Sequence, residues 1–164
     1  MRELVFVDTE TTGLNSETDL LVELTYAVED DDPVTLFFGV KEVPDFIDDL
    51  TKFSARKVYD EPAATEEQIE TFKKALENQT MVAGNPKFDV GFLEANDLYT
   101  AHYRTLDVQS YAMAKFDLDA VPSMKDIRFI LAELGYRGLT EPDHSSRNDV
   151  LFMREAFRIM RYQF

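Results

Sequence analysis

The stretch LVFVDTETTGL, residues 4–14, decides how this 164-residue chain is read. Four apolar residues, Leu4 to Val7, are followed at once by Asp8 and, two positions later, by Glu10. Alternate side chains of a strand point to one face, so a strand that persists through Glu10 brings both carboxylates together. Two close carboxylates repel unless a cation lies between them, and a hard divalent ion suits their oxygen ligands. Taken alone, the pair also fits a strand that ends at the surface with two solvated acids.

The composition indicates a protein that folds and that works in a reducing compartment. Hydrophobic residues make up 45% of the chain, and 164 residues suit one domain, which we place over residues 1–164. The absence of cysteine excludes disulfides and thiolate metal sites, and it fits a cytoplasmic location. The first apolar run is too short for a signal peptide or a membrane span. A compact acidic chain is also compatible with a virus-encoded protein acting in a bacterial host.

The net charge of −15 bears on which partners are possible. An acidic protein repels phosphodiesters at long range, and proteins that bind nucleic acids usually carry basic patches. We interpret most of the acids as a solvated surface, with residues 29–32 (EDDD) forming a turn between two strands. Contact with phosphates is one interpretation of the basic residues Arg56, Lys57, Lys87 and Arg147, with Arg147 the best candidate because it lies in the third segment. Solvation is the default that we adopt for them. Any attraction for an anionic substrate must therefore be local, and bound divalent cations would supply it.

Periodicity predicts the other elements. Strands are expected over residues 20–29, 34–40, 81–83 and 103–106, the first two pairing with residues 4–7 as an antiparallel meander. Helices are expected after a capping box at Thr65–Gln68, over residues 87–94, from about Val108, over 124–134, and from Ser146 to about Tyr162. Strands that give way to alternating helices and strands predict an α/β domain with a mixed sheet.

A second acidic segment is GNPKFDVGFL, residues 84–93. Phe88 and Phe92 are four residues apart and share one helix face, which we expect to meet the core. Asp89 would lie beside that face, close to the sheet. A single acid in the first turns of a helix is also favoured by the helix dipole alone, so this segment by itself leaves both readings open.

The third segment is PDHSSRND, residues 142–149. His144 and Asp149 are five residues apart, which on one helix separates them by roughly 140°. They converge only if His144 lies in the loop and Asp149 in the first turns of the helix. Pro142 and the two serines before Arg147 favour that boundary. Asp149 would then head an inward apolar stripe, where a buried acid requires a partner.

Together the three segments resemble the three motifs of the DEDDh family of 3′→5′ exonucleases, which includes proofreading subunits of bacterial replicases, ribonuclease T and oligoribonuclease. FVDTETTGL is similar to the first motif almost letter for letter, GNPKFDVGFL to the second (H-N-x-x-F-D-x-x-F-L) and HSSRND to the third (H-x4-D). The order matches, and the motifs span residues 5–149. The resemblance favours a catalytic role for the acids of each segment over a purely structural or solvated role.

The resemblance implies a ribonuclease-H-like fold, an α/β domain with a five-stranded mixed sheet flanked by helices. It implies that Asp8, Glu10, Asp89 and Asp149 hold two Mg²⁺ or Mn²⁺ ions and that His144 is the general base. We expect Asp8 to bridge the two ions, because a strand end is a rigid position. Glu10 and Asp149 would complete the ion that activates water, and Asp89 would help to hold the second ion.

The implied substrate is nucleic acid with a free 3′ end, single-stranded, cleaved to nucleoside 5′-monophosphates. We favour DNA over RNA, and the sequence leaves both open. The terminal nucleotide would contact residues of the first and second motifs: Glu10, Thr11, Thr12, Gly13, Leu14, Asn85 and Phe88. Phe88 as a plain core residue is an equal alternative. A replication or repair partner is compatible with the resemblance, and the oligomeric state is open.

Two departures and two alternatives accompany the resemblance. Gly84 replaces the histidine that usually opens the second motif, and the segment between the second and third motifs looks reduced.

A binding module that kept the fold and lost turnover is one alternative function, since a fold does not fix an activity. An endonuclease of the ribonuclease H or resolvase type is the other, although such enzymes lack this D-x-E and H-x4-D pairing.

Overall fold

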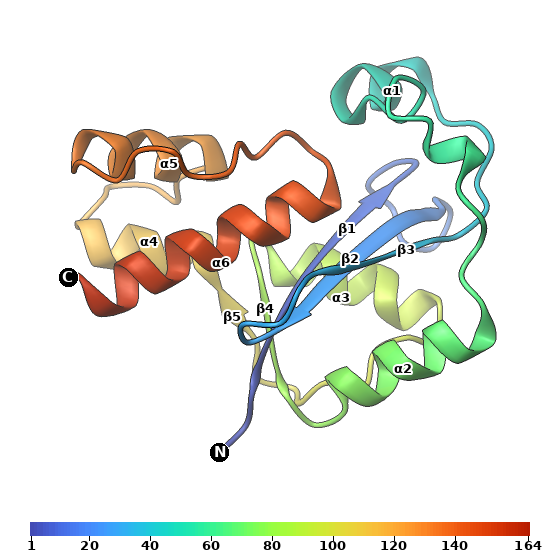
Figure 1. Cartoon of the computed structure of the whole chain (residues 1–164), viewed down its shortest axis with the longest axis horizontal. Coiled ribbons are helices and arrows are strands. Elements are labelled where there is room, and N and C mark those ends of the chain that lie inside the picture. Colours follow the sequence, from blue (N-terminus) through green and yellow to red (C-terminus); the bar gives the residue numbers. More distant parts are fainter.

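The computed structural model describes all 164 residues and contains a five-stranded sheet flanked by helices (Figure 1). The strands are β1 (Leu4–Thr11), β2 (Leu21–Val28), β3 (Val34–Phe37), β4 (Thr80–Ala83) and β5 (Leu106–Asp107). Their order across the sheet is β3-β2-β1-β4-β5. β1 is antiparallel to β2 and parallel to β4, while β2–β3 is antiparallel and β4–β5 parallel. The predicted mixed sheet with an antiparallel meander is therefore confirmed.

Six α-helices and one short 3₁₀ helix complete the fold. They are α1 (Asp45–Thr51), η1 (Val58–Asp60), α2 (Glu66–Leu76), α3 (Pro86–Ala95), α4 (Val108–Phe116), α5 (Met124–Glu133) and α6 (Ser146–Tyr162). The capping box that begins α2 is present, with Thr65 Oγ1 accepting from the Gln68 N–H at 3.2 Å and the Gln68 side chain accepting from the Thr65 N–H at 2.9 Å. No helix is both long enough and apolar enough to cross a membrane.

The two faces of the sheet bury separate cores, because alternate residues of β1 point in opposite directions. Phe6 faces α6, and packs with Val82 from β4 and with apolar residues of α4, α5 and α6. Val5 and Val7 face the other way, toward α2 and α3. Asp8 and Glu10 continue the series begun by Phe6, so the alternation directs both acids to the α6 side.

Three predicted elements differ from the structure at their ends. β3 stops at Phe37 and not at residue 40, because Gly39 adopts a left-handed backbone conformation (φ 70°) that ends the ladder. β5 covers Leu106–Asp107 and not residues 103–106, since it pairs only with the last two residues of β4. Helix α1 and the 3₁₀ helix were not predicted. They lie in the long crossing between β3 and α2.

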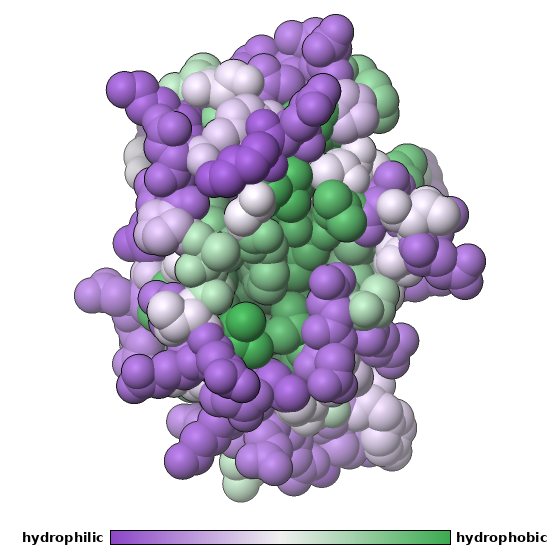
Figure 2. Space-filling view, turned by 90° about the vertical axis from the view of Figure 1, so that its right-hand side faces the viewer, coloured by the Kyte–Doolittle hydropathy of each residue, from purple (hydrophilic) through white to green (hydrophobic).

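Viewed from the side where α1 and the segment leading to α2 lie in Figure 1, the surface is hydrophilic around a hollowed hydrophobic centre (Figure 2). Soluble proteins rarely leave a large contiguous apolar area exposed without a use for it. This side of the molecule is therefore where contacts with other molecules are to be sought.

Candidate active site

The end of β1 supplies the first two carboxylates of the site. β1 pairs with β4 only through Leu4–Phe6, because β4 ends at Ala83, whereas the pairing of β1 with β2 continues to Thr11. Past Phe6, one edge of β1 is therefore open. A register shift between Glu10 and Thr11 then turns the chain away from the sheet.

Helix α3 places Asp89 at that open edge. The Asp89 carboxylate accepts from the Thr9 N–H at 3.0 Å and from the Thr9 hydroxyl at 2.8 Å, both through Oδ1. A strand N–H without a neighbouring strand needs an acceptor, so the short β4 explains why an acid is held here. Asp89 is 3% exposed, so its carboxylate is buried beside the strand.

The first turn of α6 supplies Asp149 and is held against the sheet by buried polar contacts. The Ser146 N–H donates to the Glu23 carboxylate at 2.8 Å, and the Ser146 hydroxyl bonds the Thr25 hydroxyl at 2.7 Å. Both β2 residues are buried and lie directly opposite β1 acids, Glu23 opposite Glu10 and Thr25 opposite Asp8. α6 is thus docked directly over the carboxylates of β1.

Glu23 is a functional-region residue that the sequence reasoning missed. It lies opposite Glu10, where two like charges would destabilise the strand pair. The Arg56 guanidinium offsets this repulsion by binding both Glu23 carboxylate oxygens, at 3.1 and 3.2 Å. Arg56 is therefore half of an ion pair, and its interpretation as a solvated residue was wrong. No local pattern links positions 23 and 56.

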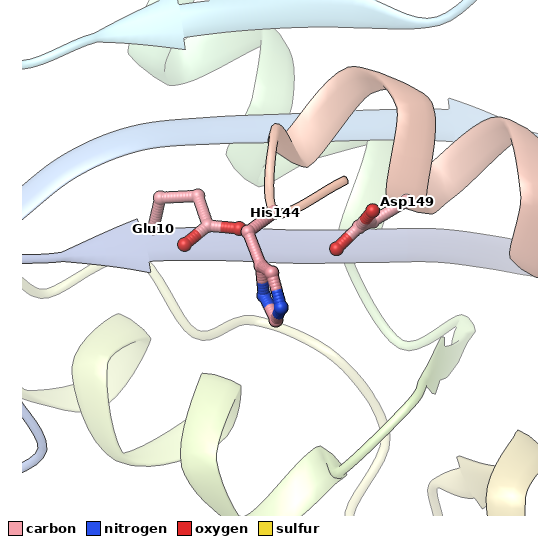
Figure 3. Close-up of side chains that lie close together, drawn as sticks. All are labelled: Glu10, His144 and Asp149. Carbon is pink, nitrogen blue, oxygen red and sulfur yellow. The ribbon is translucent and has the colours of Figure 1, made fainter. Parts of the chain in front are cut away.

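His144 lies in the loop before α6, as predicted, and Asp149 lies in the first turn of that helix (Figure 3). One ligand atom each from Glu10, His144 and Asp149 lie within 4.8 Å of one another. His144 has a left-handed backbone conformation (φ 61°), which is uncommon for residues other than glycine. Burial and the nearby Lys125 lower the pKa of the His144 imidazole below its ordinary value, which favours the neutral ring.

Asp143, the residue before His144, fixes this loop through four hydrogen bonds. Its side chain accepts from the Ser145 N–H and hydroxyl at 3.1 and 2.7 Å, and from the Asn148 side chain at 3.0 Å. Its own N–H donates to Asp149 Oδ1 at 3.0 Å. The loop that carries His144 is thus tied directly to Asp149. The sequence pattern had no signal for this role.

One hollow of about 260 Å³ collects nearly all of the predicted site residues. Its lining includes Asp8, Glu10, Asp89, His144 and Asp149, together with Thr11, Gly13, Leu14, Asn85 and Phe88. Thr12 lies outside this lining, and its hydroxyl accepts from the Leu20 N–H at 2.8 Å. Seven lining residues were not predicted as site residues: Thr9, Gly84, Gln109 and Met124, with Ile47, Leu50 and Thr51 from α1.

The side chain of Met124 occupies the space beside Gly84. A Cβ built on Gly84 would meet Met124 Sδ at 3.7 Å, an ordinary van der Waals distance. The thioether side chain therefore lies over the glycine and lines the hollow. Where the second motif usually opens with histidine, this chain therefore has a glycine covered by the apolar side chain of Met124.

The carboxylates raise one another's pKa values. Burial is the largest cause at each one, and neighbouring acids add to it. The pKa values of Asp8 and Glu10 are raised well above their ordinary range, and those of Asp89 and Asp149 to about 7. Such mutual repulsion is relieved when a cation binds between the acids.

The residues present fit a divalent metal site. Asp8 Oδ2 is buried and has no hydrogen-bond partner in the protein. A buried carboxylate oxygen without a donor is costly, whereas an ion would satisfy it. Carboxylate oxygens are the ligands that Mg²⁺ and Mn²⁺ prefer. Glu10 and Asp149, near the imidazole of His144, complete a set of donors of that kind.

Comparison with known proteins supports the same interpretation. Residues 5–157 match the RNase T family model, which is described as "Exonuclease". The DNA polymerase III subunit epsilon of Treponema pallidum is 28% identical over 163 residues, covering 93% of this chain and 74% of that protein. The PolC-type DNA polymerase III of Clostridium perfringens is 32% identical over 99 residues, covering 57% of this chain and 7% of that protein.

Solved structures share the fold. Exonuclease I from Methylocaldum szegediense and E. coli Exonuclease I in complex with a dT13 oligonucleotide each superpose with a TM-score of 0.70 over 99% of this chain. Their identities to this chain are 14% and 11%, and the match covers 41% of each of those chains. This chain thus spans about two fifths of the Exonuclease I chains. The predicted ribonuclease-H-like fold is confirmed.

Proposed function

We propose a reaction for this chain from one premise: the chain belongs to the RNase T exonuclease family. It is accordingly a 3′→5′ exonuclease, a hydrolase of phosphodiester bonds. The proposal specifies the chemistry further. Four carboxylates and one histidine from three separate segments line one hollow, and Asp8 Oδ2 lies buried there without a partner. That convergence is the observation that carries the proposal.

Asp8, Glu10, Asp89 and Asp149 would hold two Mg²⁺ or Mn²⁺ ions, which supply an activated water and stabilise the negative charge of the phosphorane and of the leaving oxygen. The protein's own contribution is a rigid arrangement of these four acids. β1 fixes Asp8 and Glu10, Thr9 fixes Asp89 through two hydrogen bonds, and the Asp143 N–H fixes Asp149. Such prior orientation lowers the cost of reaching the transition state.

His144 accepts the proton of the attacking water in this proposal. Its lowered pKa keeps the imidazole neutral near pH 7, so a ring nitrogen is available as a base. The water oxygen bonds to the terminal phosphorus, and the bond from phosphorus to the 3′ oxygen of the preceding nucleotide breaks. That 3′ oxygen takes up a proton from the solvent, and His144 later releases its own proton to the solvent. The products are a nucleoside 5′-monophosphate and a strand shorter by one nucleotide with a 3′ hydroxyl.

We place the terminal nucleotide against the turn that follows β1. Thr11, Gly13 and Leu14 line the hollow on that side, and Asn85 and Phe88 line it from the start of α3. The Leu14 side chain is 85% exposed beside this hollow, so it is available for contact with a base. Thr12 remains part of the proposal through the turn that it stabilises.

Single-stranded DNA is the proposed substrate. One relative is a DNA polymerase III subunit, and one structural neighbour was solved with a dT13 oligonucleotide. These facts concern longer proteins, and they support the proposal for this chain by analogy. Association with a replication or repair assembly is proposed on the same basis.

The experiment uses a 5′-labelled oligonucleotide, as DNA and as RNA, with Mg²⁺ or Mn²⁺ and an EDTA control. We expect a ladder shortening from the 3′ end that EDTA abolishes and that Asp8→Ala or Asp149→Ala eliminates while the fold remains intact. Undiminished turnover in either variant contradicts the proposed site. Cleavage of a circular single strand would identify an endonuclease, and binding without product would identify a binding module.

A further inference from the structure

Helix α1 forms one wall of the catalytic hollow through Ile47, Leu50 and Thr51. Ile47 is buried and anchors α1 in a small apolar cluster with Val22, Phe53 and Val58. Thr51, one turn later, is also buried, and its hydroxyl donates to the Ile47 carbonyl at 2.7 Å. These contacts fix α1 over the end of the sheet, and Leu50 is thereby placed in the lining of the hollow.

α1 carries two large apolar side chains that are exposed. Phe46 is 67% exposed and Leu50 is 48% exposed. They are four residues apart and so lie on the same helix face, about 6 Å apart along the axis. Leu50 lines the hollow and Phe46 does not, so Phe46 lies outside the hollow, one helical turn from Leu50 on the same face of α1. The wall is continuous with the catalytic site, which distinguishes it from a scattered surface residue.

The charges of α1 restrict what this wall can contact. Asp45 and Asp49 are the exposed charged residues of the helix, and α1 contains no basic residue. A phosphate is repelled here, whereas the neutral face of a nucleobase is not. Flat apolar and aromatic side chains are the usual means by which proteins bind successive bases of a single strand.

We propose that Leu50 and Phe46 form a base-stacking wall that receives unpaired bases near the 3′ end of the substrate, Leu50 at the hollow and Phe46 one nucleotide further along the strand. This inference rests on the proposed function and identifies a cause of single-strand selection. A hollow of about 260 Å³ is small for a ligand site and suits one nucleotide better than a base pair. In a duplex the base faces are already stacked, so the wall has nothing to bind.

The chain provides matched controls for a test. Phe129 on α5 is 67% exposed, as Phe46 is, and Leu134 at the end of α5 is 48% exposed, as Leu50 is. Neither control residue lines the catalytic hollow. We expect Phe46→Ala to raise KM for an eight-nucleotide single strand by about 5- to 150-fold, the range for loss of one base–aromatic stack. The kcat should change less than about twofold, as expected for a ground-state contact.

A second substrate separates failure of this inference from failure of the proposed function. The p-nitrophenyl ester of thymidine 5′-monophosphate has no neighbouring base, so Phe46→Ala should leave its hydrolysis unchanged. If the wild type hydrolyses neither substrate, the proposed function fails. If it hydrolyses both and Phe46→Ala behaves like Phe129→Ala on the oligonucleotide, the stacking wall alone is refuted.

Two further variants complete the test. Phe46→Tyr retains an aromatic face and should restore the low KM, and Leu50→Ala should weaken binding where Leu134→Ala does not. Equal losses on the oligonucleotide and on the ester would instead mean that α1 only supports the fold. A change in sedimentation with unchanged kinetics would assign the wall to protein association, which also overturns the proposal.

Discussion

At the scale of the residue, Asp143 and His144 illustrate how a base is held in a strained position. The left-handed backbone at His144 costs free energy for a residue that carries a side chain. Four hydrogen bonds made by Asp143 offset that cost and connect the loop to Asp149. The histidine is therefore oriented before any substrate binds.

We predict that Asp143→Ala lowers kcat by about tenfold or more, because the side-chain bonds that orient His144 are lost. The Asp143 N–H and its bond to Asp149 remain in this variant. Metal affinity, measured by Mn²⁺ titration, should therefore stay near that of the wild type. Asn148→Ala, which removes only one of the bonds, is the matched control and should have a smaller effect.

His144→Ala is predicted to slow turnover by about 10²- to 10⁴-fold, the usual contribution of a general base. Metal affinity should be nearly unchanged. His144 lies close enough to Glu10 and Asp149 to be a ligand as well, so the Mn²⁺ titration decides between the two roles. A loss of affinity that parallels the loss of turnover would assign His144 to the metal.

At the scale of the element, the site depends on strands of unequal length and on one docked helix. β4 stops before β1 does, which leaves the edge where Asp89 binds Thr9. The Glu23–Arg56 pair and the Ser146 contacts hold the first turn of α6 over that end of the sheet. Replacing either support should disturb Asp149 without touching it.

Glu23→Gln is predicted to destabilise the protein by about 1–3 kcal/mol, because Arg56 loses its charged partner. The Arg56 side chain is 28% exposed, so solvent screens the ion pair and the loss is smaller than for a fully buried pair. Loss of the Glu23 charge beside Glu10 acts in the opposite direction but is the smaller effect. Urea unfolding of Glu23→Gln, Arg56→Met and the double variant gives the coupling energy of the pair. A double variant as unstable as the sum of the single variants would contradict the pairing.

At the scale of the whole molecule, negative charge is the main influence on how stability depends on pH and on metal. The chain carries a net charge of −15, and five carboxylates gather at one end of the sheet, with Arg56 as the cation bound among them. Without metal, the ionised cluster opposes folding. With metal, the same cluster contributes to stability, since an ion that binds only the folded state favours it.

The metal-free protein should lose stability as pH rises from about 4 to about 7. The folded pKa of Asp89 is raised from 3.8 to about 7, chiefly by burial. A raised pKa means that the folded state binds the proton more tightly, so this contribution is full below the unfolded pKa and is lost as pH passes the folded one. Urea unfolding in EDTA across this range measures it.

Asp89→Asn is the control, because the amide oxygen keeps the Thr9 bonds and carries no titrating proton. The difference between wild type and variant should shrink toward low pH and grow toward pH 7 in favour of the variant. Added Mn²⁺ should stabilise the wild type more at pH 8 than at pH 5.5, since ligands must lose their protons to bind the ion. A flat difference with pH would contradict a raised pKa at Asp89.

Local patterns in the sequence determined the strand that carries Asp8 and Glu10, the capping box at Thr65, the boundary between His144 and Asp149, and the mixed sheet, because periodicity and capping act over a few residues. Only the tertiary structure decided the pairing of Glu23 with Arg56, the cover of Met124 over Gly84, the bonds of Asp143 to its loop, and the wall formed by α1. The physical reason is the separation in sequence of the residues that interact. An ion pair between positions 23 and 56, or a helix held by one buried isoleucine, depends on where distant segments meet in the folded chain.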